Sequence, residues 1–359
     1  MKVLQLGKFY PILGGVEKVM WELAEGLGRQ GVECDMLCAG KTSQIIPINE
    51  HARCICVKAL FKAAATMISP AMILYLRRHC VEYEIVHIHH PDPMAALALR
   101  LSGYKGKVVL HWHSDIIKQR ILLKFYLPLQ NWMVKRSDVI IGTSPVYVKE
   151  SPYLQGVQEK LACVPIGIDP LPQVSAEPSE YKTVFSLGRL VGYKGYEYLA
   201  EAAKYLPDNY RVVIGGEGPL REKLLGQICA EGLEDKVSLP GRIPQESLPE
   251  MFASCSVFCL SSIWKTEAFG IVQIEAMSCG KPVVATRIPG SGVSWVNEHG
   301  FSGLNVEPCC AKQLADAIME ITANDDVYRK YCRNALDRYK TMFTKKVMID
   351  KCLDIYEKL

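Results

Sequence analysis

The sequence predicts an α/β protein with two doubly wound domains in tandem. Short apolar runs of strand length alternate with helical segments along the chain, as in parallel sheets that helices cover on both faces. The 359 residues, of which 49% are hydrophobic, exceed what one hydrophobic core usually needs. A proline-rich stretch from Pro170 to Tyr181 lacks strand or helix periodicity, so we expect the linker between the two domains there.

The first domain is predicted over residues 1–170. Its first strand, at 2–7, leads through a glycine turn into a helix at 16–31, in which apolar residues recur at helical spacing. Continuous apolar runs predict further buried strands at 32–40, 84–90, 107–114 and 138–144.

The second domain is predicted over residues 171–340 and repeats the alternation of strands and helices. Its strands are expected at 181–190, 210–218, 236–243, 257–263 and 282–288. The last helix, over residues 341–359, is expected to pack back on the first domain. Ligands bind beyond the carboxyl ends of the strands in open α/β sheets, so two such domains that face each other would enclose a ligand cleft.

Composition and charge exclude several functional classes. The formal net charge of +4 is too small to indicate a nucleic-acid-binding protein. The N-terminus lacks the apolar core of a signal peptide, and no run of 18 apolar residues predicts a membrane-spanning helix. The 14 cysteines show no zinc-binding spacing, so we expect buried, reduced thiols in a cytoplasmic protein.

The segment from Thr266 to Gly280 carries the clearest functional signal. A helix that begins at Phe269–Gly270 would direct backbone N–H groups and the positive end of its dipole at an anion such as a diphosphate. Glu267, in the preceding loop, is expected to accept hydrogen bonds from a sugar, and Glu275 from the cis-diol of a ribose. Taken alone, the two acids fit a surface carboxylate and a helix salt bridge equally well.

Glycine-rich turns follow two other strands of the second domain. Arg189 and Lys194 lie in the turn that contains Gly188, where two cations would neutralise charge on a departing diphosphate. Two solvated surface charges would give the same pattern. Gly216 lies in a second turn, GGEGP, which is a weak signal by itself.

Together these motifs resemble the retaining glycosyltransferases of family 4, which have the GT-B fold of two Rossmann-like domains facing across a cleft. The resemblance rests on LGGVEK, HWHSD, GRLVGYKG, GGEGP, LPGRIP and EAFGIVQIEAMSCGKPVVAT, which occur in family order over essentially the whole chain. The wider pattern is similar to mannosyl- or rhamnosyltransferases of O-antigen and capsule assembly. The resemblance implies an enzyme that moves a hexose from a nucleoside diphosphate sugar to a lipid-linked or growing glycan in surface polysaccharide synthesis.

The resemblance also implies which residues bind the donor. It assigns Glu267 to the hydroxyls of the donor sugar, Glu275 to the ribose, and Arg189 and Lys194 to the phosphates of the leaving group. It assigns the remaining donor contacts to Gly14 and Gly15 in the first domain, to Gly188 and Gly216, to Arg242 and Ile243 at the base, and to the backbone of Phe269, Gly270 and Ile271.

Histidines that follow two strands of the first domain are expected on the acceptor side. His113 matches the family's histidine near the transferred sugar, whereas His111 is expected to point to the other face of its strand. His89 or His90 is expected to line the acceptor side, and Asp115 to help position the acceptor.

We expect the reaction to need no metal ion or other cofactor. The chain has no D-x-D motif, and no set of cysteines or aspartates at ligand spacing accompanies the histidines. The expected catalytic residues are His113, Arg189, Lys194 and Glu267. In retaining members of the family the leaving phosphate is thought to accept the proton of the acceptor hydroxyl, so no side-chain nucleophile is required.

Two basic amphipathic segments, at residues 56–80 and 116–136, suit a surface that touches anionic lipid. The second contains Lys118 and Lys124 among large apolar residues. Ordinary domain helices would show the same pattern. Because the family often uses polyprenyl-diphosphate-linked acceptors, we expect a cytoplasmic protein at the inner face of the cytoplasmic membrane.

Other functions fit parts of the sequence. A dinucleotide-dependent oxidoreductase would need a G-x-G-x-x-G turn after the first strand, and GKFYPILGG is not one. A non-catalytic sugar-nucleotide-binding protein would not need the full set of expected catalytic and donor residues. Their presence argues against this alternative: Arg189, Lys194, Glu267, Glu275 and His113. A UDP-sugar transferase with a soluble acceptor stays open, because the base could be guanine or uracil. GDP-mannose is our first choice of donor, and the linkage formed stays open.

Overall fold

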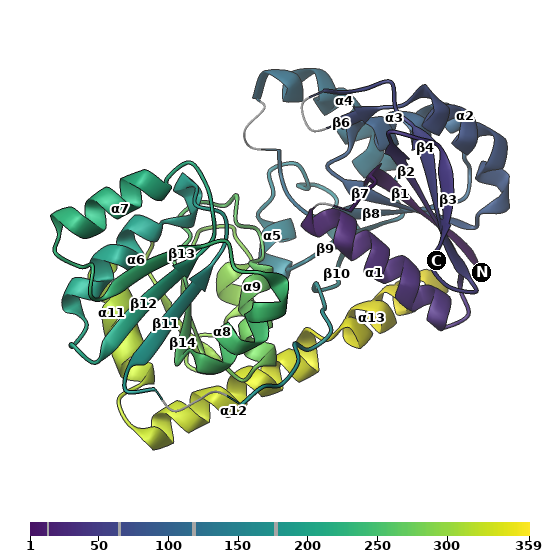
Figure 1. The fold of residues 1–359 in the computed structure, drawn as a ribbon. Helices are drawn as coiled ribbons and strands as arrows, with labels where there is room; N and C mark the ends of the chain where they lie inside the picture. The colour runs from purple at the N-terminus through teal and green to yellow at the C-terminus, as the bar shows by residue number, and fades with distance from the viewer. Residues whose placement is uncertain (13, 64–65, 117–119, 176–178) are drawn as a thin grey trace. The chain divides into compact units, whose positions relative to one another are not determined.

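The computed structural model describes residues 1–12, 14–63, 66–116, 120–175 and 179–359, with the backbone alone at 120 and 121. The chain divides into two compact units, one made of Met1–Gly167 with Lys345–Leu359 and the other of Ile168–Thr344 (Figure 1). The sequence predicts the ends of the first and second domains at residues 170 and 340, whereas the units change at 167/168 and 344/345. The described part of the expected linker forms no helix or strand, and residues 176–178 lie outside the described residues.

The first unit contains an eight-stranded sheet in the order β10-β9-β8-β7-β1-β2-β4-β3. The strands are parallel except for β3, which pairs antiparallel with β4. Their bounds are β1 (Lys2–Phe9), β2 (Glu33–Gly40), β3 (Gln44–Pro47), β4 (Ala52–Lys58), β7 (Ile85–His90), β8 (Lys107–Trp112), β9 (Val139–Gly142) and β10 (Leu161–Cys163). The strand order changes direction between β1 and β7, which is where ligands bind in such sheets.

Helices cover both faces of this sheet. Helices α1 (Gly15–Arg29) and α13 (Lys345–Glu357) contact each other on one face, and α2, α3 and α4 form a contiguous layer on the other (Figure 1). The bounds of the remaining helices are α2 (Pro70–His79), η1 (Cys80–Glu82), α3 (Pro93–Ser102), α4 (Arg120–Arg136), α5 (Pro145–Lys149) and η2 (Gln158–Lys160).

The C-terminal helix α13 is part of the first unit although it follows the second unit in sequence. Lys345 makes ion pairs with Glu22 and Glu25 of α1. Gly26 allows the two helices to approach closely, because a Cβ atom at this position would lie 1.9 Å from Cδ1 of Ile349. The contact brings α13 over the strands that carry the histidines.

The segment 56–80 comprises several elements. It contains the end of β4, the short hairpin strands β5 (Phe61–Ala63) and β6 (Thr66–Ile68), and helix α2. The segment 116–136 forms α4 from residue 120 onward, and Lys118 lies outside the described residues. Among the described parts of the chain, no helix combines the length and apolar character that a bilayer crossing requires.

The second unit contains a parallel six-stranded sheet in the order β13-β12-β11-β14-β15-β16. Its strands are β11 (Lys182–Leu187), β12 (Tyr210–Gly215), β13 (Val237–Gly241), β14 (Val257–Leu260), β15 (Val283–Thr286) and β16 (Gly303–Val306). Its helices are η3 (Gly192–Lys194), α6 (Tyr196–Ala202), η4 (Ala203–Tyr205), α7 (Arg221–Ala230), η5 (Gln245–Ser247), α8 (Leu248–Ser254), α9 (Ile271–Ser278), α10 (Val293–Val296), α11 (Ala311–Ile321) and α12 (Asp325–Met342). This strand order is that of a Rossmann sheet, whose switch point lies between β11 and β14.

The apolar residues of both units form the cores that the strand pattern predicts. In the second unit, Val184 and Val257 of neighbouring central strands are buried together with Leu314 and Ile318 of α11. Burying such side chains stabilises the fold by about 2 kcal/mol each. These cores fix the carboxyl ends of the strands, where the polar residues lie.

Candidate functional site

The loops that follow β11 and β14 meet at the switch point of the second unit. Lys194 lies at the end of the short helix after β11, and Glu267 lies in the loop after β14. Lys194 Nζ is 2.6 Å from Glu267 Oε2, and the two side chains are only 9% and 13% exposed. Ser262 Oγ donates a hydrogen bond to the same carboxylate oxygen at 3.1 Å. Two residues that are 73 positions apart in the chain thus form a largely buried ion pair at the carboxyl ends of the strands.

Buried polar contacts hold the Glu267 loop in place. Ser291 Oγ donates to the Glu267 carbonyl, and the Gly292 N–H donates to the Ala268 carbonyl at 2.9 Å. Thr286 Oγ1 donates to the Ser262 carbonyl. We did not identify Ser262, Thr286 or Ser291 from the sequence. Ser262 was accessible to such reasoning, because it lies two residues after the end of the buried strand β14.

Helix α9 begins immediately after this loop, as the sequence predicts. Its N-cap is Gly270, in the left-handed conformation with φ 77°. A Cβ atom there would lie 2.7 Å from Gln273 Nε2, so the turn favours glycine both conformationally and sterically. The amide of Gln273, which is fully buried, also donates to the Phe269 carbonyl at 3.0 Å. The first turn of α9, including Ile271, therefore begins in a fixed position beside Glu267.

Glu275 lies one turn further along α9 and is half-buried. The positive end of a helix dipole and the N–H groups of its first turn favour an anion at this end. Glu267 thus precedes the start of α9 and Glu275 lies within the helix, and the expectation that the two acids bracket a diphosphate stays a prediction.

The glycine turns pack tightly against this site. Gly216 has φ 138°, and a Cβ atom there would lie 1.9 Å from the Gly188 carbonyl oxygen. A Cβ atom at Gly188 would in turn lie 3.3 Å from Lys194 Nζ. The structure therefore brings Gly188, Gly216, Lys194 and Glu267 into one contiguous group.

The remaining predicted donor residues of the second unit are more peripheral. Arg189 is exposed and belongs to the same turn as Gly188. Arg242 is exposed and follows β13, the strand at the edge of the sheet. Ile243 lies against Gly215 at the end of β12, because a Cβ atom at Gly215 would be 2.7 Å from Cγ1 of Ile243. These positions extend the site along the carboxyl ends of β11, β12 and β13.

In the first unit, Gly14 and Gly15 form the exposed start of α1, with Gly14 as its N-cap. A Cβ atom at Gly14 would lie 2.3 Å from Glu17 Oε2, because the Glu17 carboxylate folds back over the turn. Leu13, between the first strand and this turn, lies outside the described residues.

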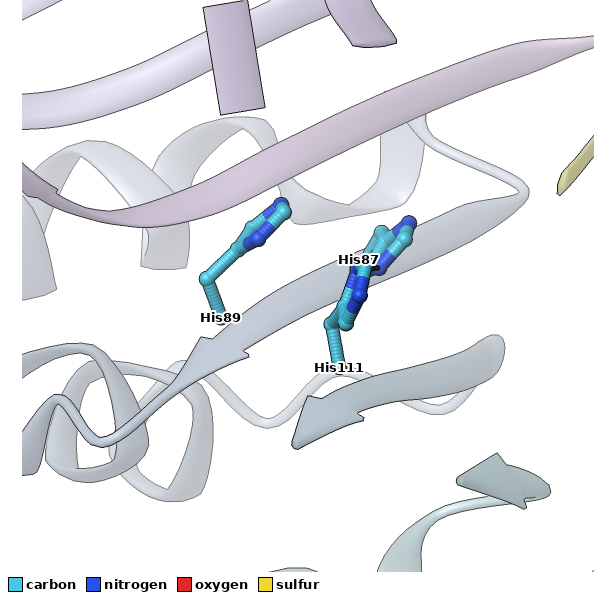
Figure 2. A group of neighbouring side chains, drawn as sticks. All are labelled: His87, His89 and His111. Atoms are coloured by element: carbon cyan, nitrogen blue, oxygen red, sulfur yellow. Dashed lines mark hydrogen bonds between the residues drawn. The ribbon is translucent and has the colours of Figure 1, made fainter. Parts of the chain in front are cut away.

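His111 and His113 point to the same face of the sheet, so the expectation that His111 points away is wrong. Their rings stack with centroids 4.0 Å apart and an interplanar angle of 16°. The physical reason is that side chains alternate with a period of two along a strand, so positions i and i+2 share a face. His87 and His89 of β7 share this face as well, as Figure 2 shows for His87, His89 and His111.

His113 is bonded within the first unit. Its Nε2 lies 2.9 Å from His89 Nδ1, and 6% of the residue remains exposed. His89 is fully buried. His90, on the opposite face of β7, stacks on Trp112 with ring centroids 3.8 Å apart. Of the three, His113 alone keeps any exposed surface, whereas His89 and His90, one of which was expected to line the acceptor side, are fully buried.

Asp115 ties down the loop after β8. Its Oδ1 accepts hydrogen bonds from Trp112 Nε1 at 2.9 Å and Ser151 Oγ at 2.8 Å, and its N–H donates to the Tyr147 hydroxyl at 2.9 Å. These bonds orient the carboxylate toward the protein. The bonds of Asp115 thus hold the loop after β8 in place, and its role toward an acceptor stays a prediction.

The histidines are held neutral by burial. Desolvation lowers the pKa of His87, His89, His90 and His113 well below the ordinary value, and that of His111 to about 3. A neutral imidazole offers one N–H donor and one lone pair.

His87, His89 and His111 form a group whose nitrogens could hold a metal ion, since one ligand atom from each lies within 4.8 Å of the others. The three rings are nearly parallel, with interplanar angles of 6° to 28° (Figure 2). His87 Nε2 already faces His111 Nδ1 at 3.2 Å, and His89 Nε2 faces Gln5 Oε1 at 2.7 Å. These nitrogens therefore already take part in a hydrogen-bonded network, with which a bound metal ion would have to compete.

An apolar cavity of about 510 Å³ opens beyond the carboxyl ends of β1, β7 and β8 in the first unit. Its walls include Met94, Leu97, Leu123, Phe125 and Leu129, and Lys8 is the charged residue among the described residues of its lining. The Lys8 ammonium donates to the Pro91 carbonyl. Burial lowers the pKa of Lys8, an effect that the nearby carboxylates of Asp92 and Glu17 oppose.

The sequence matches known proteins over its whole length. The family model described as "Glycosyltransferase Family 4" matches residues 13–170, and the model "Glycosyl transferases group 1" matches residues 168–338. The chain is 30% identical to the D-rhamnosyltransferase WbpZ of Pseudomonas aeruginosa, over 96% of this chain and 92% of that protein. The chain belongs to the glycosyltransferases of group 1 and family 4. This glycosyltransferase is also 29% identical to the O-antigen chain mannosyltransferase C of Escherichia coli, over 100% of this chain and 99% of that protein.

Solved structures agree with this assignment at the level of the fold. The Anabaena HepE protein, crystallised with UDP and glucose, superimposes with a TM-score of 0.77 at 19% identity, over 100% of both chains. The prediction of a GT-B glycosyltransferase with two Rossmann-like domains is thus confirmed, and the chain is an enzyme that transfers a sugar.

The ion pair predicts a specific pattern of stability. Lys194→Ala should lower the free energy of unfolding by about 3 kcal/mol, because it leaves the Glu267 carboxylate without its cation in a largely buried site. Urea unfolding of the full chain measures this loss. The double variant Lys194→Met/Glu267→Gln removes both charges and should recover most of it. A double variant no more stable than Lys194→Ala would contradict a coupled pair.

The buried histidines predict that stability falls as the solution is acidified. The unfolded chain takes up protons on these rings below about pH 6.5, whereas the folded chain keeps them neutral. Their stabilising contribution is therefore complete above about pH 6.5 and is lost toward lower pH, by up to about 1.4 kcal/mol per pH unit for each ring. Urea unfolding between pH 7.5 and 5.0 measures the slope.

A matched variant tests the origin of this slope. His90→Phe retains the stacking on Trp112 and removes one titrating ring, so its slope should be shallower than that of the unmodified chain. Equal slopes would exclude His90 as a contributor, and stability independent of pH in this window would exclude all of the buried histidines.

Proposed function

We propose that this glycosyltransferase moves a hexose from a nucleoside diphosphate sugar, with retention of anomeric configuration, to a lipid-linked or growing glycan in surface polysaccharide synthesis. The observation that carries the proposal is the Lys194–Glu267 pair beside the N-terminus of α9, at the switch point of the second unit. A cation, a carboxylate and a helix N-terminus at one point supply the groups that bind a diphosphate next to a sugar.

In the proposed reaction the diphosphate of the donor occupies the first turn of α9. Arg189 and Lys194 neutralise the charge that develops on it as the bond between the anomeric carbon and the phosphate oxygen breaks. The acceptor hydroxyl forms the new bond on the same face, and its proton passes to the departing phosphate oxygen. Glu267 accepts hydrogen bonds from the sugar hydroxyls, and Glu275 from the ribose.

The charges of this site supply the electrostatic stabilisation that a divalent ion supplies in other transferases, so we propose a reaction without a metal or other cofactor. His113 is assigned to a hydroxyl of the reacting sugars, because it keeps exposed surface at the end of β8. The base is assigned to the region of Arg242 and Ile243.

GDP-mannose is our first choice of donor. Two relatives that match nearly all of this chain are named a mannosyltransferase and a D-rhamnosyltransferase, which supports a hexose or deoxyhexose donor of this kind. The second candidate is a UDP-sugar used with a soluble acceptor, which is favoured by the structural similarity to a protein crystallised with UDP and glucose.

The apolar cavity of the first unit supports an acceptor with a lipid part. Its volume of about 510 Å³ and its aliphatic and aromatic walls suit an alkyl segment, and Lys8 at its lining suits a phosphate attached to that segment. A wholly soluble glycan would gain little from these apolar walls.

Exposed apolar side chains near this cavity support a peripheral position at the inner face of the cytoplasmic membrane. Phe125 is 81% exposed and Leu122 is 52% exposed on α4, beside the exposed Lys124. Phe61, on the β5–β6 hairpin, is 59% exposed beside Lys62. Large apolar residues interspersed with lysines are typical of surfaces that bind anionic bilayers.

Titration with nucleotides tests the donor site. A ligand at about 100 times its Kd stabilises the folded chain by about 2.7 kcal/mol, which raises the Tm by several degrees. GDP and GDP-mannose should raise the Tm, whereas NAD should not. Arg189→Ala should reduce the shift at a given concentration without lowering the Tm of the free protein, because the side chain is exposed.

The other nucleotides separate the alternatives. A shift with UDP in place of GDP would favour the UDP-sugar alternative. No shift with GDP, UDP, dTDP or ADP would contradict the proposed donor site.

Vesicle flotation tests the membrane surface. The full chain should float with vesicles that contain anionic phospholipid, and Phe125→Ser and Lys124→Glu should each reduce the bound fraction. Leu225→Ser is the matched control, because Leu225 is an exposed apolar residue of the second unit. Binding independent of anionic lipid, or unchanged in both α4 variants, would contradict the proposal.

A further inference from the structure

A chain of hydrogen bonds links the C-terminal helix to His113. Gln5 Nε2 donates to the Tyr356 hydroxyl of α13 at 3.0 Å, and Gln5 Oε1 lies 2.7 Å from His89 Nε2. His89 Nδ1 lies 2.9 Å from His113 Nε2. Gln5 and His89 are fully buried and Tyr356 is 3% exposed, so water does not substitute for these contacts.

The donor and acceptor roles along this chain follow from one another. Because the amide nitrogen of Gln5 donates to Tyr356, its oxygen is left to accept from His89, so the proton of His89 is on Nε2. A neutral His89 then has a lone pair on Nδ1, and it accepts from His113 Nε2–H. The lone pair of His113 is therefore on Nδ1, which has no hydrogen-bond partner among the residues that the structure describes.

A second branch from Tyr356 is consistent with the same assignment. The Tyr356 hydroxyl accepts from Gln5, so its own proton is available for His87 Nδ1, with which it is in contact. His87 is then protonated on Nε2 and donates to His111 Nδ1 at 3.2 Å. All four histidines of this face can thus remain neutral, in agreement with their lowered pKa values.

We propose that Tyr356 and Gln5 are positioning residues that hold His113 as the Nε2–H tautomer, so that its Nδ1 accepts a hydrogen bond from a hydroxyl of the reacting sugars. The inference rests on the proposed function for the identity of that hydroxyl. Under this proposal α13 does more than pack against α1. It also supplies the Tyr356 hydroxyl, which orients the Gln5 amide.

Nitrogen NMR of the full chain labelled with ¹⁵N-histidine tests the tautomer directly. His113 in the unmodified protein should show an unprotonated Nδ1 and a protonated Nε2. Tyr356→Phe removes the hydroxyl that orients Gln5, so the His113 resonances should move toward a mixture of the two tautomers. Tyr104→Phe is the matched control, because this buried tyrosine bonds to backbone carbonyls of the same unit outside the network. It should leave His113 unchanged.

The second measurement is the steady-state rate of sugar transfer, with the nucleotide sugar that raises the Tm as the donor. Tyr356→Phe should lower kcat by about tenfold or more and leave KM for the donor nearly unchanged, because a wrong histidine tautomer weakens only the reacting complex. Tyr104→Phe should retain kcat. A single unchanged His113 tautomer in Tyr356→Phe would overturn the inference while leaving the proposed function intact. Absence of transfer by the unmodified protein, with the tautomer shift present, would instead contradict the proposed function.

Discussion

The proposed donor site of this enzyme depends on the ion pair between Lys194 and Glu267. The two residues reach each other only because β11 and β14 are neighbours at the switch point of the second sheet, where successive loops diverge. A charge in such a largely buried place is costly unless a partner of opposite sign is present. Each residue therefore offsets the free-energy cost of burying the charge of the other. The pair has no net charge and places a cation and a carboxylate beside a helix N-terminus.

The surrounding contacts explain why this arrangement is rigid. Ser262, Thr286 and Ser291 bind backbone or carboxylate oxygens of the Glu267 loop, and Gly216 lets the β12 turn reach the Gly188 carbonyl. A site that neutralises a leaving group works best when its dipoles are already oriented, since no energy is then spent on reorganisation during the reaction. The buried histidines of the first unit are also held in fixed orientations, because they are neutral and hydrogen-bonded to one another.

Much of the site could be predicted from the sequence because its residues follow strands. Glu267, Gly270 and Lys194 lie in motifs that can be recognised from their order and spacing without any knowledge of the fold. The helix that follows Gly270 begins where the sequence predicts it. The interpretation failed at His111, where the period of two along a strand was misapplied. The supporting serines and Thr286 were missed because short polar residues at strand ends are common and acquire a role only through their partners.

The sequence alone determined the two α/β domains, the glycosyltransferase family and the charged residues of the proposed donor site, because these depend on periodicity and local spacing. Tertiary structure alone decided that Lys194 pairs with Glu267 and that Tyr356, at the end of the chain, contacts Gln5 and His87 near its beginning. Such contacts join residues separated by up to 351 positions, and no local pattern specifies them. They arise from the strand order and from the docking of α13 on α1, which the packing of apolar surfaces determines.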